Sequence, residues 1–75
     1  MRVKPLSGVE LSIVVASNHV AQSDIAYHRQ LDRIDYMTLR GWDTSTATRI
    51  GIGLKRVLDR DLAWLKFLQE MQEPA

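Results

Sequence analysis

The chain has 75 residues, so residues 1–75 can form one small domain and no more. It contains no cysteine, which excludes disulfide bonds and thiolate metal sites. Ten lysines and arginines balance nine aspartates and glutamates to a net charge of +1, which argues against a protein that coats nucleic acid or mimics its charge.

The first predicted element is a long helix over about residues 8–40. Ser7 and Glu10 fit a capping box, in which the serine hydroxyl and the glutamate carboxylate each accept a hydrogen bond from a free backbone N–H group. Leu6 and Leu11 have the spacing of the hydrophobic staple that accompanies such a cap. No proline or glycine interrupts the rest of this segment, so one continuous helix is expected.

The beginning of this segment also fits a β-strand. Apolar residues alternate from Val9 to Val15, and β-branched side chains are frequent among them. The agreement between the capping box and the staple favours the helix. The alternative architecture is an N-terminal strand followed by two helices.

A clear break follows at Gly41, Trp42 and Asp43. Gly41 suits the left-handed residue that ends a helix. Asp43 can cap a second helix over about residues 44–72, with hydroxyl-bearing residues in its first turn. The predicted fold class is therefore all-α, an antiparallel two-helix hairpin.

Each predicted helix carries an apolar stripe when successive residues are placed about 100° apart. The first stripe alternates mostly between spacings of four and three, as in a coiled-coil-like pair, and consists of Val9, Ile13, Ala16, Val20, Ser23, Tyr27, Leu31, Ile34 and Thr38. The second stripe consists of Ala47, Ile50, Leu54, Val57, Leu58, Leu62, Leu65 and Leu68. Trp64, Phe67 and Met71 widen the second stripe beyond half of the helix circumference.

These apolar surfaces are wider than one antiparallel neighbour can cover. Small natural scaffolds commonly solve this problem by oligomerising. We therefore predict a homodimer that forms a four-helix bundle. The predicted dimer interface consists of Leu11, Val14, Val15, Asp61, Trp64, Phe67 and Met71.

Asp61 is the polar residue within the apolar arc of the second helix. An unpaired buried carboxylate is costly, so Asp61 should have a partner if its side chain lies inside the bundle. In a hairpin that turns at Gly41, Ser23 lies opposite Asp61 and Tyr27 lies one turn away. Their hydroxyl groups, or a histidine or arginine of a dimer mate, could donate to the carboxylate. In the alternative reading the bundle is open here and Asp61 is solvated.

The sequence contains no motif for catalysis or cofactor binding. The segment Gly51–Arg56 has two glycines before a lysine, but it lacks the spacing of a phosphate-binding loop and lies within a helical pattern. Small residues at Ala47 and Gly51 are better explained by close approach of another helix.

His19 and His28 are not spaced as metal ligands on one helix face. We predict a non-enzymatic protein without a cofactor or a metal site.

Basic residues gather toward the predicted turn, where Trp42 also lies. Residues 29–56 carry a net positive charge, whereas residues 57–75 carry a net negative charge. Tryptophan and arginine are the residue types most enriched at binding hot spots. An acidic protein surface or nucleic acid is the expected partner, and a merely solvated face is the alternative. The predicted partner-binding residues are Arg29, Arg33, Arg40, Trp42, Arg49, Lys55 and Arg56.

The segment from Ser45 to Leu54 is similar to the second helix of ribbon-helix-helix repressors and antitoxins, where a capping serine precedes small and apolar residues punctuated by arginine. The resemblance implies that Gly41 lies between two helices and that residues 9–15 form the DNA-reading strand of a dimer. The stretch from Val15 to Gly41 is longer than the first helix of that family.

The function expected from the sequence is that of a small adaptor or regulatory protein that acts as a homodimer by binding another macromolecule. A DNA-binding regulator of the ribbon-helix-helix type is the alternative. The longest unbroken apolar run, from Ile13 to Ala16, is far short of the roughly 20 residues that cross a bilayer. A cytoplasmic protein without a membrane partner is therefore expected.

Overall fold

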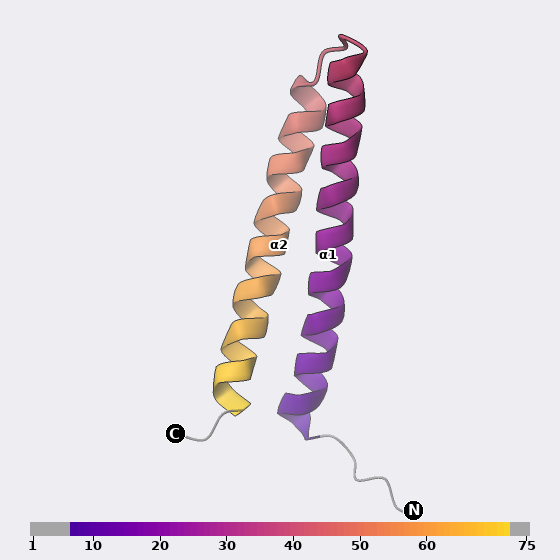
Figure 1. Ribbon diagram of the computed structural model, residues 1–75. Coiled ribbons are helices and arrows are strands. Elements are labelled where there is room, and N and C mark those ends of the chain that lie inside the picture. The colour runs from indigo at the N-terminus through magenta and orange to yellow at the C-terminus, as the bar shows by residue number, and fades with distance from the viewer. Residues whose placement is uncertain (1–6, 73–75) are drawn as a thin grey trace, which may run out of the picture.

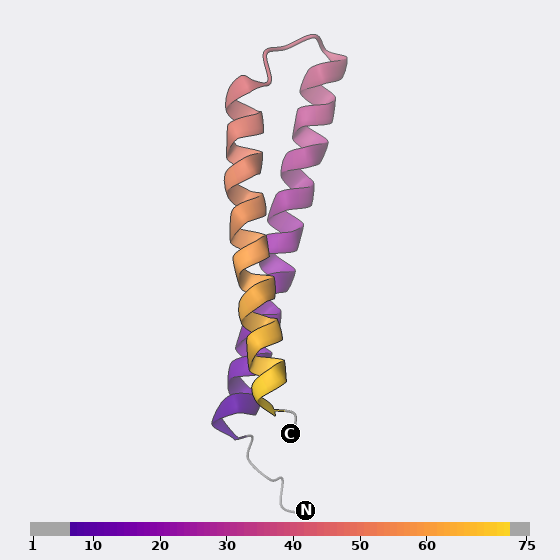
Figure 2. The same cartoon turned by 90° about the vertical axis from the view of Figure 1, so that its left-hand side faces the viewer.

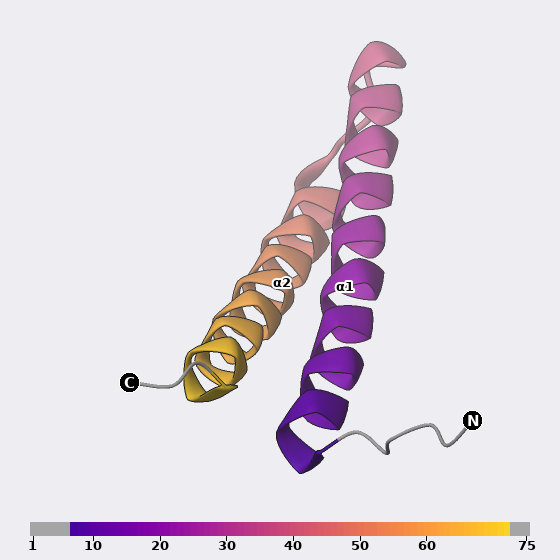
Figure 3. The ribbon, with the colours of Figure 1, turned by 60° about the horizontal axis from the view of Figure 1, so that its bottom comes forward.

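A computed structural model describes residues 7–72, which form two helices packed against each other as an antiparallel hairpin (Figure 1). Helix α1 spans Gly8–Leu39 and helix α2 spans Ser45–Gln72. The two helices lie side by side in a single layer, and their axes cross at a shallow angle that is visible in Figures 2 and 3. The predicted hairpin and its bounds are confirmed to within one residue at each helix end.

The capping box at the start of α1 is present. The Glu10 amide donates to the Ser7 hydroxyl at 3.1 Å, and the Ser7 amide donates to Oε2 of Glu10 at 3.3 Å. Residues 9–15 lie in the first turns of α1, so the alternative of an N-terminal strand is wrong. The cap satisfies backbone donors that a strand would have to pair elsewhere. Leu6, the other half of the expected staple, lies outside the described residues.

The turn between the helices is a Schellman motif, in which two amides beyond the helix end reach back to carbonyls of its last turn. The Gly41 amide donates to the Thr38 carbonyl at 3.0 Å, and the Trp42 amide donates to the Met37 carbonyl at 2.9 Å. Gly41 has a φ of 71°, the left-handed conformation predicted for it. The helix therefore ends because its last carbonyls are satisfied by the turn itself.

The cap predicted at Asp43 is shifted by one residue, because the Thr44 carbonyl accepts the first hydrogen bond of α2, from the Thr48 amide at 2.8 Å. The first residue of the helix donates instead to the side chain of Asp43. Its Oδ1 atom accepts hydrogen bonds from the Ser45 amide at 2.9 Å and from the Ser45 hydroxyl at 2.6 Å. These bonds hold the pKa of Asp43 below its usual value, the hydroxyl bond contributing most. A charged carboxylate at this position also interacts favourably with the positive end of the helix dipole.

The interface between α1 and α2, called here the hairpin interface, follows a strict alternation of three- and four-residue steps. On α1 its residues are Val9, Ile13, Ala16, Val20, Ser23, Tyr27, Gln30, Ile34 and Met37. On the other side its residues are Thr44, just before α2, and, within α2, Ala47, Gly51, Leu54, Leu58, Asp61, Leu65 and Leu68. This alternation is the signature of coiled-coil packing.

The observed interface corrects the predicted stripes. Gln30 and Met37 of α1 join the interface, Thr38 is exposed, and Leu31 remains partly buried beside Gln30. Gly51 and Asp61 lie in the interface on α2. The predicted core positions on α2 that are exposed instead are Ile50, Val57 and Leu62, at 49%, 38% and 44%. The cause is geometric. A helix that contacts a single neighbour does so through the residues at one range of helical angles, whether or not they are apolar. Gln30, Gly51 and Asp61 lie within that range.

The hairpin interface buries few apolar side chains. Its buried apolar side chains are Ala16, Ala47, Leu58 and Leu68, and none of the described side chains is completely enclosed. Gln30 is the buried polar residue, and its Nε2 atom donates to the Ala47 carbonyl of α2 at 2.8 Å. Two alanines and an amide at the contact leave little apolar area to hold the helices together.

Candidate functional site

An exposed apolar stripe runs along α2 beside the hairpin interface. Ile50, Val57, Trp64 and Met71 recur at every seventh position and are 49%, 38%, 54% and 56% exposed. We call these four residues the α2 stripe. Residues seven apart lie about 20° apart around a helix, so the four side chains share one face. Helix α1 leaves this face open.

The exposed apolar surface of the α2 stripe continues onto the N-terminal half of α1. Trp64 stacks on Phe67 with ring centroids 5.4 Å apart and an interplanar angle of 24°. The same tryptophan lines a shallow hollow of about 290 Å³ together with Leu11, Val15 and His19 of α1. Leu11 and Val15 are 54% and 47% exposed. Apolar side chains of both helices therefore meet on one side of the hairpin.

Most of the predicted dimer residues lie on or near this side. Leu11 and Val15 are brought beside Trp64, and Phe67 stacks on it. Val14 is exposed but does not line the hollow. Asp61 lies in the hairpin interface, where its Oδ2 atom accepts a hydrogen bond from the Ser23 hydroxyl. Ile50 and Val57 were predicted as core residues, although successive steps of seven residues place them on one face with Trp64.

The turn end carries a compact aromatic and basic cluster. The Arg40 guanidinium lies 5.2 Å from the centre of the Tyr36 ring, and its Nε donates to the Tyr36 hydroxyl at 3.2 Å. Trp42 meets the same ring edge-on at a centroid distance of 5.8 Å. Trp42 and Tyr36 remain 55% and 50% exposed. The tryptophan thus packs on Tyr36, and about half of its surface is exposed.

The predicted basic residues are divided between the two helices. Arg29, Arg33 and Arg40 share one face of α1, since steps of four and seven residues change the helical angle by only about 20–40°. Arg49, Lys55 and Arg56 belong to α2. The Lys55 ammonium contacts Oδ1 of Asp59 at 2.6 Å, and this hydrogen bond together with the attraction of the charges raises the pKa of Lys55.

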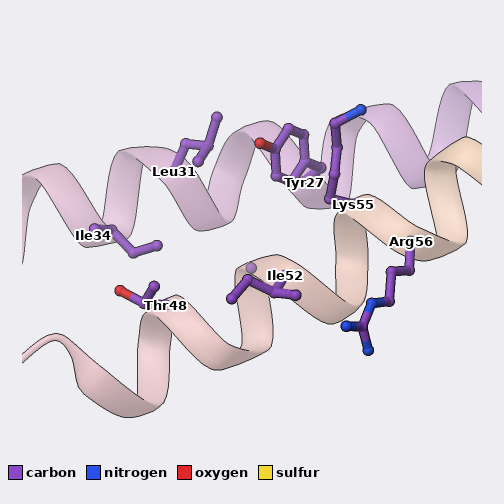
Figure 4. A pocket seen from close by; sticks show the side chains of 8 residues that line it. Tyr27, Leu31, Ile34, Thr48, Ile52, Lys55 and Arg56 are labelled. Atoms are coloured by element: carbon purple, nitrogen blue, oxygen red, sulfur yellow. The ribbon is translucent and has the colours of Figure 1, made fainter.

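A groove opens between the helices near the turn, and Figure 4 shows the side chains around it. It has a volume of about 310 Å³ and is lined by Tyr27, Leu31, Ile34, Thr48, Gly51, Ile52, Lys55 and Arg56. Gly51 lines it without a side chain, and Cδ1 of Ile34 lies 3.5 Å from where its Cβ atom would be. We call this feature the groove.

Possible metal ligands are dispersed over the described residues. Among residues 7–72 no three metal-ligating side chains come together. His28 instead contacts Asp24 of the preceding turn, with Nδ1 3.2 Å from the carboxylate. In the described part of the chain neither helix combines the length and apolar character needed to cross a membrane.

Comparison with known proteins identifies no relative of this chain. No protein-family model, no curated protein and no solved structure matches this chain.

Proposed function

We propose that the protein is a small non-enzymatic adaptor or regulatory protein that acts as a homodimer and binds another macromolecule. The observation that carries this proposal is the α2 stripe, a regular row of large apolar side chains on the side of α2 that α1 leaves open. Monomeric proteins rarely expose a contiguous apolar surface of this kind, and a partner chain is its usual cover.

The energetics favour a second copy as the cover. Complete burial of a large apolar side chain is worth about 1.5–3 kcal/mol, so covering the exposed halves of four such chains contributes about 3–6 kcal/mol per copy. Two copies together reach about 6–12 kcal/mol, against an association cost estimated at roughly 4–15 kcal/mol. The dimer must therefore also cover Leu11, Val15 and Phe67, which extend the same surface.

The geometry of such a dimer is a four-helix bundle. The α2 stripe is flanked by Leu54, Asp61 and Leu68 of the hairpin interface, so stripe and flank together repeat at steps of four and three. Two helices with this repeat pack side by side as in bundles. A two-fold axis is the simplest arrangement, because it places the same surface of each copy against the other.

The partner surface is proposed at the turn end. Arg29, Arg33 and Arg40 form a basic row on α1, and the half-exposed Trp42 lies beside Arg40 on the Tyr36 ring. A macromolecule with an acidic surface fits this combination of charge and aromatic area. The ribbon-helix-helix alternative lacks support, because residues 9–15 are helical and no strand is available there to read DNA.

Sedimentation velocity tests the dimer. The unmodified protein is expected to sediment as a dimer at micromolar concentration, and replacement of Trp64 and Phe67 by alanine is expected to shift it to monomer. Ile25→Ala is the control, since Ile25 is comparably exposed and belongs neither to the predicted dimer interface nor to the hollow beside Trp64. A stable monomer of the unmodified protein at micromolar concentration contradicts the proposal.

A second experiment tests the partner surface. The protein and an Arg29→Glu/Arg33→Glu variant are used to capture partners from the native host, with nuclease treatment of a parallel sample. Specific proteins retained by the unmodified protein, lost with the variant and resistant to nuclease support the proposal. Loss of all specific binding on nuclease treatment would instead identify nucleic acid as the partner.

A further inference from the structure

We infer that the groove binds an amphipathic helix of a partner protein, with apolar side chains in the groove and an acidic side chain on Arg56. The inference rests on the proposed function in that it supplies a second, chemically defined contact for the partner macromolecule. The groove and the α2 stripe use different faces of the hairpin, so one copy can bind a partner helix while the other face is covered by the dimer.

The shape of the groove favours an elongated occupant. Its walls are Tyr27, Leu31 and Ile34 of α1 and Ile52 of α2, so it follows the direction of the two helices (Figure 4). A third helix can pack into the apolar groove between two helices by the same insertion of side-chain ridges into grooves that joins the two helices. Gly51 lines the groove without a side chain, and a Cβ atom there would already contact Cδ1 of Ile34 at 3.5 Å.

The charge at the rim defines the chemistry of the occupant. The side chains that line the groove include two cations and no carboxylate. Lys55 is engaged by Asp59 at 2.6 Å, whereas Arg56 has no ion-pair partner among the described residues. In Figure 4 the guanidinium of Arg56 extends from the end of the groove away from α1. A glutamate or aspartate one turn beyond the apolar anchors of a partner helix would reach this charge.

Two isoleucines of α2 provide a matched pair of variants. Ile52 lines the groove and is 51% exposed, whereas Ile50 belongs to the α2 stripe and is 49% exposed. The same substitution, isoleucine to glutamate, can therefore be placed on either surface at equal exposure and in the same turn of the helix. Ile52→Glu tests the groove, and Ile50→Glu tests the dimer.

The probe is a blocked helical peptide of about fifteen residues with leucines at positions i, i+3, i+4 and i+7 and glutamates beside them. A second peptide carries lysine in place of each glutamate. Binding is followed by fluorescence anisotropy, and the site is located by the methyl shifts of Ile34, Ile50 and Ile52. The glutamate peptide is expected to bind and to shift Ile34 and Ile52, with the lysine peptide at least about tenfold weaker.

The variants give separate outcomes. Ile52→Glu should weaken the glutamate peptide at least about tenfold and leave sedimentation unchanged, whereas Ile50→Glu should shift the protein toward monomer and leave peptide binding unchanged. Arg56→Gln should weaken binding about two- to fivefold, the effect of one exposed ion pair, and Arg49→Gln should not. Equal binding of both peptides, shifts at Ile50 alone, or no binding at millimolar peptide would overturn the inference. Monomeric unmodified protein that still binds the glutamate peptide would overturn only the dimer.

Discussion

Ser23 of α1 donates a hydrogen bond from its hydroxyl to Oδ2 of Asp61, thirty-eight residues further along the chain, and so joins the two helices near the middle of the hairpin. The pair confirms that Ser23 lies opposite Asp61 in a hairpin that turns at Gly41. The carboxylate is thus neither free in solvent nor unpaired inside the interface. A charged acceptor gives this bond about 1.5–3 kcal/mol when it is well shielded, and less at this partly exposed site.

We predict that Asp61 determines which helices pair more than it determines stability. Asp61→Asn keeps an oxygen that accepts the Ser23 hydroxyl and should preserve both the fold and the oligomeric state. Asp61→Leu joins the hairpin interface to the α2 stripe in one apolar surface and should change the oligomeric state, because a polar residue in such an interface specifies partner number. Light scattering after size exclusion measures the change, and an unaltered assembly of the leucine variant would show that Asp61 has no such role.

Gln30 leads to a prediction about pH. In Gln30→Glu a carboxylate replaces the amide that donates to the Ala47 carbonyl, and at neutral pH the buried charge would face that carbonyl. The expected loss is about 2–3 kcal/mol in the free energy of unfolding. Burial raises the pKa of the new carboxyl group in the folded state, so the loss should disappear at low pH and grow as pH rises through the folded pKa.

Urea denaturation between pH 4 and pH 8 measures this effect. Gln22→Glu makes the same chemical change at an exposed position of the same helix and serves as the control. A constant difference between Gln30→Glu and the unmodified protein over this pH range would be inconsistent with burial of the side chain.

The two glycines of α2 should respond oppositely to larger side chains. A Cβ atom at Gly53 meets nothing within 4 Å, so Gly53→Ala should stabilise the protein by about 1 kcal/mol through helix propensity. A Cβ atom at Gly51 meets Cδ1 of Ile34 at 3.5 Å and Cγ of Gln30 at 3.7 Å. Gly51→Leu would force these helices apart and should cost about 1–3 kcal/mol.

Thermal unfolding at one fixed protein concentration checks both changes, because the stability of a dimer depends on concentration. One kcal/mol corresponds to a shift in Tm of about 4–8 °C for a domain of this size. A lower Tm for Gly53→Ala would mean that another chain approaches this glycine.

Asp43 should contribute stability in a defined pH range. Its pKa is lowered in the folded state by the hydrogen bonds from Ser45, so its contribution is fully present above the usual value of 3.8 and is lost as pH falls through the folded pKa. Asp43→Ala should therefore lower Tm at pH 7 and have a progressively smaller effect below the usual pKa. Asp43→Asn accepts the same hydrogen bonds without titrating, so its Tm difference from Asp43→Ala should stay nearly constant.

The ends of the helices could be predicted from sequence because local chemistry determines them. The capping box needs only Ser7 and Glu10, and the turn needs Gly41 in a left-handed conformation, so both follow from neighbouring residues. The pairing of Ser23 with Asp61 could be predicted as well, since the short turn determines which residues lie at the same level. These are the features in which distance along the chain decides the contact.

The rotational setting of each helix could not be predicted in the same way. A search for apolar periodicity selects Thr38 and Val57, which are exposed, whereas the structure buries Gln30 and Gly51 at the contact. Strict alternation of three and four residues from Ile13 onward would have identified Gln30. The groove also depends on this setting, because it joins Tyr27 of one helix to residues of the other. A rotation of either helix by one position would remove it.

The turn has a further consequence for the topology of the assembly. The Schellman bonds of Gly41 and the Asp43 bonds to Ser45 both require the chain to bend between α1 and α2. If the bend opened, the two helices could merge and pair with those of another copy, a domain swap that preserves every contact of the hairpin interface. Each of these hydrogen bonds would be lost in the swapped form. The short segment from Arg40 to Thr44 therefore keeps the pairing of α1 with α2 within one chain.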